Sequence, residues 1–169
     1  MNAQAYPALA VRPMLPQDAP MLADIFRRSI LELTSDDYTG SQQEAWAAAV
    51  DDEAGFAERL ARELTIIATL GGSPVGFASL EGNDKIGFLY VHPAAARQGV
   101  ATLLSDALEK IAGAQGVETL GVEASDTASG FFAKRGYVPQ QRNSVQCGHE
   151  WLANTTMHKV LPKPDRVAP

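Results

Sequence analysis

Cysteine is almost absent from this sequence, because its 169 residues include only Cys147. A single thiol excludes a disulfide within the chain and fits a reducing compartment. The first nine residues lack both a basic stretch and an apolar core, so we expect no signal peptide. No apolar run approaches the about 20 residues that a membrane-spanning helix needs. We therefore predict a cytoplasmic protein that has no membrane as a partner.

Positive charge is also scarce. Lysine and arginine number 14 against 20 aspartate and glutamate residues, which gives a net charge of −6 and a pI near 5.0. Domains that bind nucleic acid present a basic face, so we expect no nucleic acid as a partner. The 3 histidines are widely separated in the sequence and predict no metal site.

The remaining composition is that of an ordinary globular protein, with 46% apolar and 20% charged residues. No linker-like stretch divides the chain, so we expect one domain over residues 1–169. Its core should span residues 9–161, with residues 1–7 and 163–169 as loose tails.

Apolar periodicity divides the chain into elements. Three helices are predicted before residue 65, and capping patterns mark two of them, Ser41–Glu44 for the second and Asp51–Asp52 for the third. Three strands joined by turns follow, then a long helix, a strand, a short helix and a last hairpin. The expected strands are 9–13, 65–70, 75–80, 86–91, 117–124, 138–146 and 151–161, and the expected helices are 16–33, 41–49, 51–64, 99–114 and 127–135.

This order predicts an α/β chain of the mixed α+β type, with a mixed, mostly antiparallel sheet and helices on both faces. Strand 117–124 should run parallel to strand 86–91, because a helical crossover joins them. The helix between these strands should face solvent with Asp106, Glu109 and Lys110.

A small-residue loop carries the chain from strand 86–91 to the start of the long helix. The first-turn N–H groups of a helix lack partners within it and favour negative charge, so such a junction can hold phosphate. Gly99 lets a ligand approach the backbone without a Cβ in the way. The junction lacks both the P-loop pattern and the G-x-G-x-x-G pattern. Taken alone, it leaves open whether Gly99 serves a ligand or only packing.

Two segments carry a more specific signature. Ala96-Arg-Gln-Gly-Val-Ala101 resembles [Q/R]-x-x-G-x-[G/A], the diphosphate motif of the GNAT superfamily of acetyl-CoA-dependent N-acetyltransferases. Gly99 and Ala101 match that motif, whereas Ala96 departs from its first position and leaves Arg97 as a substitute. The family's A-x-x-F-Y-x-K-x-G-F segment is matched by Ala128, Phe131, Lys134 and Gly136, with Tyr137 in the last place.

A closer resemblance is to the YafP-type branch of uncharacterised bacterial acetyltransferases. The resemblance to the superfamily covers residues 11 to 161 and implies the GNAT fold, in which the fourth and fifth strands splay apart to admit the cofactor. The residues that carry the closer resemblance are Val11-Arg-Pro13, Ile25-Phe26, Asp37-Tyr38, Gln43, Ala45-Trp46, Phe131-Phe132, Val145, Cys147-Gly148, Asn154, Met157 and Lys159.

The resemblance implies acetyl-CoA as the cofactor. The strand before the loop would pair its main chain with the pantetheine arm, as if the cofactor were an added strand. The loop and helix start would hold the diphosphate, and the second segment would lie near the pantetheine or the adenine. The expected cofactor-binding residues are Leu89, Tyr90, Val91, Arg97, Gln98, Gly99, Val100, Ala101, Thr102, Ser125, Ser129, Phe132 and Arg135.

Acetyl transfer needs a proton removed from the ammonium, a donor for the developing oxyanion and an acid for the departing thiolate. The N–H of Leu89 or Val91 is the expected oxyanion donor. In most relatives the acid is the tyrosine of the F-Y pair, but this chain has Phe132 there, which cannot give a proton. Either another group protonates the thiolate, or it leaves unaided, which a thiol pKa near ~8.5 tolerates.

Three side chains are catalytic candidates for moving protons, and each also has a purely structural interpretation. Glu81 could act as a base through water or be a solvated turn carboxylate. Glu123 could face the amine or simply end a strand, and Cys147 could take part or be a small buried apolar residue. Tyr137 is expected to be a packing residue.

The acceptor pocket should lie between the early helices and the last hairpin. Its expected substrate-binding residues are Tyr38, Trp46, Trp151 and Asn154, beside Cys147. The two tryptophans could bound an apolar or aromatic amine, or Trp46 could anchor its own helix in the core.

We therefore predict an enzyme, an N-acetyltransferase that transfers acetyl from acetyl-CoA to a primary amine of a small molecule, directly in a ternary complex. Two alternatives stay open: a lysine or N-terminal acetyltransferase that acts on protein, and a non-catalytic acyl-CoA sensor, which Phe132 motivates. The protein is expected to be a monomer or a homodimer.

Overall fold

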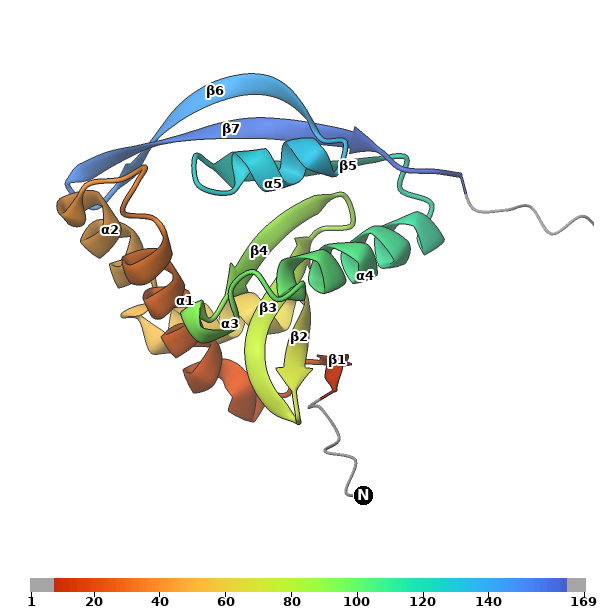
Figure 1. Cartoon of the computed structure of the whole chain (residues 1–169), viewed down its shortest axis with the longest axis horizontal. Helices are drawn as coiled ribbons and strands as arrows, with labels where there is room; N and C mark the ends of the chain where they lie inside the picture. The colour runs from red at the N-terminus through yellow and green to blue at the C-terminus, as the bar shows by residue number, and fades with distance from the viewer. Residues whose placement is uncertain (1–7, 164–169) are drawn as a thin grey trace, which may run out of the picture.

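The computed structural model describes residues 8–163, which form one seven-stranded sheet flanked by helices (Figure 1). The strand order is β1-β2-β3-β4-β5-β7-β6, and every neighbouring pair is antiparallel except β4 and β5. The predicted mixed, mostly antiparallel sheet is therefore confirmed. The strands are β1 Leu9–Pro13, β2 Leu64–Leu70, β3 Ser73–Glu81, β4 Lys85–Val91, β5 Thr119–Ser125, β6 Val138–Cys147 and β7 Glu150–Val160.

Helices cover both faces of this sheet, as the sequence predicted. One face carries α1 and α3, with α2 packed against α1 and the end of β7, and the other face carries α4 and α5 (Figure 1). The helices are α1 Ala19–Leu33, α2 Gly40–Ala47, α3 Glu53–Arg62, α4 Val100–Ala114 and α5 Ser129–Lys134, with short 3₁₀ turns at Pro16–Asp18, Ala48–Val50 and Pro93–Ala95.

The start of α2 differs from the expected capping box at Ser41–Glu44. Thr39 is the N-cap, because its hydroxyl accepts from the N–H of Gln42 at 3.2 Å. The Gln42 side chain accepts in return from the N–H of Thr39 at 2.9 Å. The reciprocal box therefore lies two residues before the predicted one. The third helix begins as expected, since Asp52 accepts from the N–H of Gly55 at 3.0 Å.

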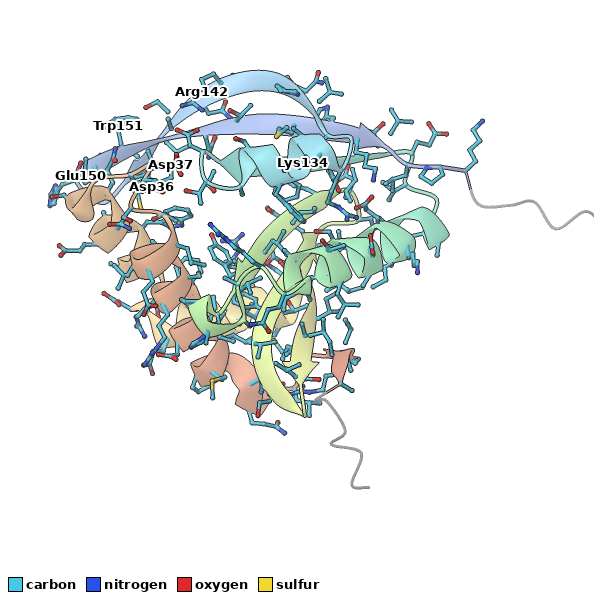
Figure 2. All side chains as sticks on the ribbon, in the orientation of Figure 1. Asp36, Asp37, Lys134, Arg142, Glu150 and Trp151 are labelled. Carbon is cyan, nitrogen blue, oxygen red and sulfur yellow. The ribbon has the colours of Figure 1, made fainter. Side chains whose placement is uncertain are left out.

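The last hairpin is long and reaches past the core. Its turn brings Glu150 and Trp151 to the end of the hairpin that lies beside α2 (Figure 2). The side chain of Gln42 on α2 donates to the carbonyl of Trp151 at 2.8 Å. Helix α2, whose N-cap is Thr39, therefore anchors the far end of the hairpin.

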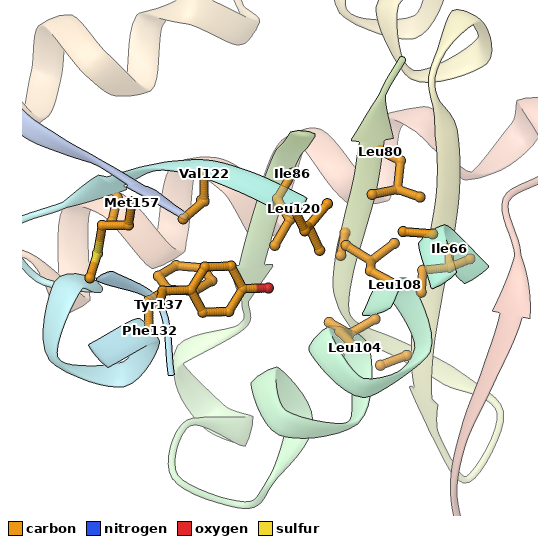
Figure 3. Packing of buried hydrophobic residues seen from close by; sticks show 14 of the residues in the cluster. Ile66, Leu80, Ile86, Leu104, Leu108, Leu120, Val122, Phe132, Tyr137 and Met157 are labelled. Atoms are coloured by element: carbon orange, nitrogen blue, oxygen red, sulfur yellow. The ribbon is translucent and has the colours of Figure 1, made fainter. Parts of the chain in front are cut away.

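Strand alternation divides the core into two clusters, one on each face of the sheet. On β4, Leu89 and Val91 pack toward α4, whereas Phe88 and Tyr90 pack toward α1 and α3. The cluster on the α4 side is aliphatic around Leu104 and joins Phe132, Tyr137 and Met157 at the other end (Figure 3). The opposite cluster is rich in aromatic rings, among them Phe26, Phe56, Phe77 and Phe88.

Strands β4 and β5 separate soon after they meet. They pair only at Lys85 with Gly121 and at Ile86 with Val122. Beyond this point β5 stays with β7 as far as Ser125, while β4 continues with β3 as far as Val91. The splay between the fourth and fifth strands that the resemblance implied is therefore present.

A β-bulge lies in β4 at the point where the two strands separate. The register with β3 shifts between Ala78 and Leu80, so that Gly87 and Phe88 together oppose Ser79. The N–H of Phe88 donates to the hydroxyl of Ser79 at 3.0 Å. The side chain of Ser79 thus satisfies a main-chain donor that the bulge removes from the ladder.

The tails expected at residues 1–7 and 163–169 lie outside the described residues, except for Lys163, which is exposed and outside regular structure. None of the helices within residues 8–163 has the length and apolar character needed to cross a membrane. The same residues hold no group of three or more His, Cys, Asp or Glu side chains placed to bind a metal ion.

Candidate active site

A cavity of about 490 Å³ lies in the gap between β4 and β5. Its walls come from both faces of the sheet: Leu89 and Phe132 from the α4–α5 side, and Tyr90 and Trp46 from the α1–α3 side. The part on the α4–α5 side is named the donor half here, and the part on the α1–α3 side the acceptor half. The cavity is therefore continuous through the gap and touches both hydrophobic clusters, which the sheet separates elsewhere.

The main chain of β4 is free on the side that faces this gap. The N–H of His92 donates to the carbonyl of Val75 at 2.8 Å, and bonded positions alternate along an antiparallel strand. Tyr90 therefore takes the next bonded position, opposite Phe77. The N–H and C=O groups of Leu89 and Val91 point the other way, toward a neighbour that β5 no longer supplies.

The loop before α4 turns on residues with positive φ. Gly99 is the N-cap, with φ of 84°, a conformation that glycine adopts at low cost. A Cβ built on Gly99 would meet no atom within 4 Å, so the space around it is open. The first intrahelical bond runs from the N–H of Leu103 to the carbonyl of Gly99, at 3.0 Å. The N–H groups of Val100, Ala101 and Thr102 precede it and are left without intrahelical partners.

The side chains of this loop are exposed beside that helix start. Arg97 has a φ of 62°, which is uncommon for a residue other than glycine. The side chain of Gln98 folds back and donates to the carbonyl of Ala94 at 3.2 Å. Of the loop and helix-start residues expected to hold the diphosphate, Ala101 lines the cavity and the others lie outside its wall.

The second motif segment lies partly in the donor half. Phe132 is 2% exposed and lines the cavity, between Phe131 and Tyr137, whose ring centroids are 5.3 and 5.1 Å away. Ser125 also lines it, and its hydroxyl accepts from the N–H of Ala128 at 3.1 Å. The predicted helix 127–135 is therefore shorter, because a turn capped by Ser125 precedes α5.

Two expected cofactor residues of this segment lie outside the cavity wall. The hydroxyl of Ser129 donates to the carbonyl of Asp126 at 3.2 Å. Arg135 is paired with Glu109 and Asp106 of α4. Glu109 is only 12% exposed and also pairs with Lys159, so the prediction that it faces solvent is wrong. Two cations from distant elements, Arg135 and Lys159, hold this carboxylate, and the periodicity of a helix gives no sign of such partners.

Tyr137 packs as the sequence predicted. It is 2% exposed, and its hydroxyl has no hydrogen-bond partner among the described residues. Burial raises the pKa of Tyr137 well above its usual value, so the phenol stays protonated. It lies beside Phe132 but not on the wall of the cavity.

Aromatic rings wall the acceptor half. Trp46 lies edge-on to Tyr38 with ring centroids 5.3 Å apart, and its centroid is 6.4 Å from that of Tyr90. Burial raises the pKa of Tyr90 to about 12, so this phenol is neutral at ordinary pH. Trp46 therefore does both things considered from the sequence: it packs against the aromatic cluster and lines the cavity.

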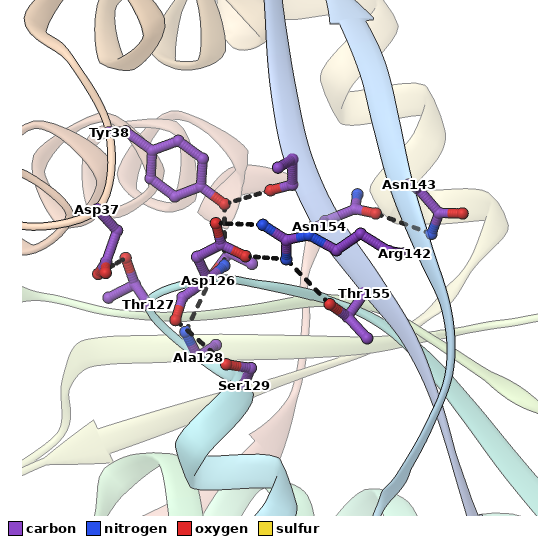
Figure 4. Close-up of polar contacts among 12 residues, drawn as sticks. Asp37, Tyr38, Asp126, Thr127, Ala128, Ser129, Arg142, Asn143, Asn154 and Thr155 are labelled. Atoms are coloured by element: carbon purple, nitrogen blue, oxygen red, sulfur yellow. Dashed lines mark hydrogen bonds and ion pairs between the residues drawn. The ribbon is translucent and has the colours of Figure 1, made fainter.

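Tyr38 joins three parts of the wall. Its hydroxyl donates to the carbonyl of Ala153 on β7 at 2.7 Å and accepts from the N–H of Asp126 at 2.9 Å (Figure 4). The Asp126 carboxylate is in turn held by Arg142 of β6, with one contact at 2.9 Å. Burial raises the pKa of Tyr38, which keeps the donor protonated. The α1–α2 loop is thereby bound to the β5–α5 turn and to the last hairpin.

The two predicted carboxylates meet in the cavity around a lysine that sequence reasoning missed. Lys85 Nζ lies 3.3 Å from Glu123 and 3.8 Å from Glu81. All three line the cavity, and strand alternation places them on its acceptor side, opposite Ile86 and Val122. Glu81 and Glu123 are each about half exposed, so water reaches both carboxylates.

A second charged group was also missed. The Glu63 side chain is 3% exposed, and Ser79 donates to its Oε2 at 3.2 Å. Arg59 Nη2 lies 3.5 Å from its other oxygen, and both Arg59 and Gly87 line the cavity. A Cβ on Gly87 would come within 2.4 Å of Glu63 Oε1, so only glycine leaves room for the carboxylate. An isolated glycine inside an apolar strand is the signal that could have predicted this close approach.

The remaining predicted residues divide between the cavity and the surface. Cys147 lines the cavity and donates to the carbonyl of Ala45 at 3.2 Å, and burial raises the pKa of its thiol. Asn154 also lines it and accepts from Asn143 at 3.0 Å. Trp151 is 57% exposed at the end of the hairpin and lies outside the cavity wall (Figure 2).

Comparison with known proteins agrees with this geometry. A family model described as the acetyltransferase (GNAT) domain matches residues 34–161. The chain is 33% identical over 149 residues to the uncharacterized N-acetyltransferase YafP of Escherichia coli (strain K12), which covers 88% of this chain and 94% of that protein. This chain belongs to the GNAT family of acetyltransferases. The resemblance to the family and to its YafP-type branch is therefore confirmed.

Solved structures of GNAT proteins share the fold. The crystal structure of a GCN5-related N-acetyltransferase from Rhodopseudomonas palustris is 60% identical, with a TM-score of 0.88 over 95% of this chain and 99% of that one. The PaiA N-acetyltransferase of Thermoplasma acidophilum, solved in complex with coenzyme A, is 18% identical, with a TM-score of 0.75 over 90% of this chain and 99% of that one. The second likeness concerns the fold alone.

As a GNAT N-acetyltransferase, the protein uses acetyl-CoA, which supplies the acetyl group as a thioester. The site fits this donor in three respects: the main chain of Leu89 and Val91 is free, the start of α4 has unpaired N–H groups, and the space around Gly99 is open. Phe132 fills the position at which the family resemblance leads one to expect an acid, and the rings of Phe131 and Tyr137 pack against it.

Proposed function

We propose that this GNAT protein acetylates the primary amine of a small molecule, directly, while acetyl-CoA and the amine are both bound. The observation that carries the proposal is the single cavity that joins the two faces of the sheet through the β4–β5 gap. A thioester in the donor half and an amine in the acceptor half would meet beside Leu89 and Val91. The free N–H groups there would donate to the carbonyl oxygen of the acetyl group.

The walls of the acceptor half support a small acceptor. Tyr38 binds the α1–α2 loop to Ala153 and Asp126, so the loop closes over the cavity from one side. A protein or peptide acceptor would need an open groove there. Trp46 and Tyr90 offer flat apolar surface to an organic amine instead.

The charged group of the acceptor half supports roles in proton transfer. We assign Glu123 and Glu81 as the residues that take the amine proton through water, because both reach the cavity and are half exposed. Lys85 would hold them in place. The thiol of Cys147 is protonated and bonded to Ala45, which argues against a covalent acyl-enzyme. With Phe132 in the wall, we propose that no side chain protonates the leaving sulfur.

Release of free thiol from acetyl-CoA tests this function. The acceptor panel contains small primary amines, lysine-containing peptides and a blank without acceptor. We expect thiol release with small amines at least about 10-fold faster than with peptides, a difference of about 1.4 kcal/mol. Equal rates on peptides would favour the protein acetyltransferase. A rise in Tm with acetyl-CoA but no release with any acceptor would favour the sensor that Phe132 motivates.

A further inference from the structure

The guanidinium of Arg59, which lines the acceptor half, has unused N–H donors. It makes no hydrogen bond with any group in residues 8–163, and its one ion-pair contact there is to Glu63 at 3.5 Å. Arg12 and Arg142, in contrast, each hold a carboxylate through two N–H groups. Arg59 is 42% exposed and lines the main cavity. A guanidinium has five N–H donors in a fixed fork, so most of its binding capacity is free.

The same guanidinium is held in one place. Its Cζ lies 4.1 Å above the centre of the Phe88 ring, a cation–π contact. Behind it, Glu63 is buried and anchored by Ser79. A buried carboxylate needs a cation nearby, and Arg59 supplies it at 3.5 Å without donating a hydrogen bond to Glu63. An arginine supported on a ring and a carboxylate is preorganised, so little entropy is lost when a ligand binds.

Arg59 stands where two cavities meet. Besides the cavity in the gap, it lines a smaller one of about 250 Å³ between α3 and β4. Trp46, Gly87 and Tyr90 line both. A ligand in the acceptor half would thus have aromatic surface on one side and the free fork of Arg59 at its edge.

Charge of the opposite sign lies in the same half. Glu81 and Glu123 share one lysine, Lys85, so this group carries a net negative charge that favours an ammonium. Lys85 contacts two carboxylates, whereas Arg59 contacts one, Glu63, and is the other cation among the residues that line the cavity. One guanidinium with unused N–H donors suits a carboxylate better than a phosphate, which carries about two charges.

We infer that the acceptor is an amine that also carries a carboxylate, and that Arg59 determines this specificity by binding the carboxylate. The class is that of α-amino acids with an apolar or aromatic side chain. The ammonium would lie toward Glu123 and Glu81, and the side chain would lie against Trp46 and Tyr90. This inference rests on the proposed function, since it names the acceptor of the same site.

The wild-type enzyme gives the first test. Phenylalanine, tryptophan, leucine and methionine are each compared with the corresponding amide and the corresponding decarboxylated amine, at equal concentrations of unprotonated amine. We expect kcat/KM for at least one acid to exceed that of its two partners by about 10- to 100-fold, as when a charged hydrogen-bonding group is removed from a built site.

Variants of the same helix give the second test. Arg59→Gln should lower kcat/KM for the preferred acid by about 10- to 100-fold, mainly through KM, and should leave the decarboxylated amine within about 2-fold. Arg59→Lys should recover part of the loss, because it restores charge without the fork. Arg62→Gln is the matched control, since Arg62 is exposed on α3 and lines no cavity described above. The double variant Arg59→Gln with Glu63→Gln avoids an unpaired buried carboxylate if the single variant folds poorly.

The outcomes distinguish failure of the carboxylate-binding role of Arg59 from failure of the proposed acetyltransferase function. If amines without a carboxylate are acetylated as well as every acid, or if Arg59→Gln lowers both equally in folded protein, Arg59 is not the receptor. The inference is then overturned while the proposed function stands. If no small amine of any kind releases thiol, the proposed function fails and this inference fails with it.

Discussion

The hydroxyl of Tyr38 donates to the main-chain carbonyl of Ala153 at 2.7 Å, across 115 residues of sequence. The same oxygen accepts from the N–H of Asp126 at 2.9 Å. One phenol therefore satisfies two main-chain groups on different elements, and the wall of the acceptor half depends on it. A buried group of this kind is costly to leave unpaired.

Replacing Tyr38 by phenylalanine should weaken both the fold and the site. Tyr38→Phe leaves the Asp126 N–H and the Ala153 carbonyl without their partner, so we expect a loss of about 1–3 kcal/mol in the free energy of unfolding. KM for the amine should rise while KM for acetyl-CoA stays the same. Urea unfolding and steady-state kinetics measure the two effects.

The neighbouring Asp37 supplies the control for this experiment. Its exposed carboxylate accepts from Thr127 at 2.8 Å, so Asp37→Asn should change stability by no more than about 0.5 kcal/mol. Equal effects of the two substitutions would contradict the role given to Tyr38.

Two glycines of the α4 region should respond in opposite directions to alanine. Gly99 has φ of 84°, so Gly99→Ala should cost about 1–2 kcal/mol and weaken the binding of acetyl-CoA. Gly113 lies within α4 and has open space around it, so Gly113→Ala should stabilise by about 0.5–1 kcal/mol. Thermal unfolding with and without acetyl-CoA measures both. A shift of the same sign in the two variants would show that φ at Gly99 is not the reason.

Cys147 should be dispensable for turnover. Its thiol is protonated because burial raises its pKa, and it is bonded to the carbonyl of Ala45. We expect Cys147→Ala to keep kcat within about 2-fold, since a neutral thiol is a poor nucleophile. Thiol release at saturating amine measures this. A fall of several orders of magnitude in folded protein would place the thiol in the chemistry.

Acid should weaken the contact between β1 and the turn before α1. Arg12 donates to both oxygens of Asp18, at 2.8 and 2.9 Å, and holds the pKa of that carboxyl below its usual range. A lowered pKa means that this stabilisation is complete above the unfolded value near about 3.9 and is lost as pH falls through the folded value.

The stability difference between wild type and Asp18→Asn should therefore be full at neutral pH and shrink below about pH 4. Urea midpoints measured from pH 7 to pH 3 test it. Asp24→Asn is the control, because Asp24 is half exposed and pairs with Arg28 one helical turn away, where such pairs contribute little. A difference that does not depend on pH would contradict the role of the Arg12 ion pair.

Local patterns predicted the parts of this protein that depend on local physics. The strand at β4, the turn at Gly99 and the helix after it are set by apolar runs and by one conformationally free residue. The parallel pairing of β5 with β4 followed from the crossover helix between them. The splay of these strands was implied only by the family resemblance, because no run of residues shows where two strands separate.

The positions of the charged groups in the site could not be predicted from such local patterns. Arg59 lies on α3 and Glu63 directly after it, and the burial of Glu63 depends on Ser79 of β3 and Gly87 of β4. The side chain of Glu109 is mostly covered for the same kind of reason, since its cations, Arg135 and Lys159, come from the end of α5 and from β7. Trp151 illustrates the converse, because this large aromatic residue of the last hairpin, expected in the acceptor pocket, is exposed at the end of the hairpin.

The gap between β4 and β5 also bears on the order of events during turnover. Because the walls of the two halves belong to opposite faces of one sheet, we expect that neither ligand has to cross the space of the other to arrive or to leave. We therefore expect no obligatory sequence of addition, with spent coenzyme able to stay bound while the acetylated amine is exchanged. Slow turnover at high amine concentration would then reflect a dead-end complex, in which spent coenzyme A occupies the donor half and unreacted amine the acceptor half.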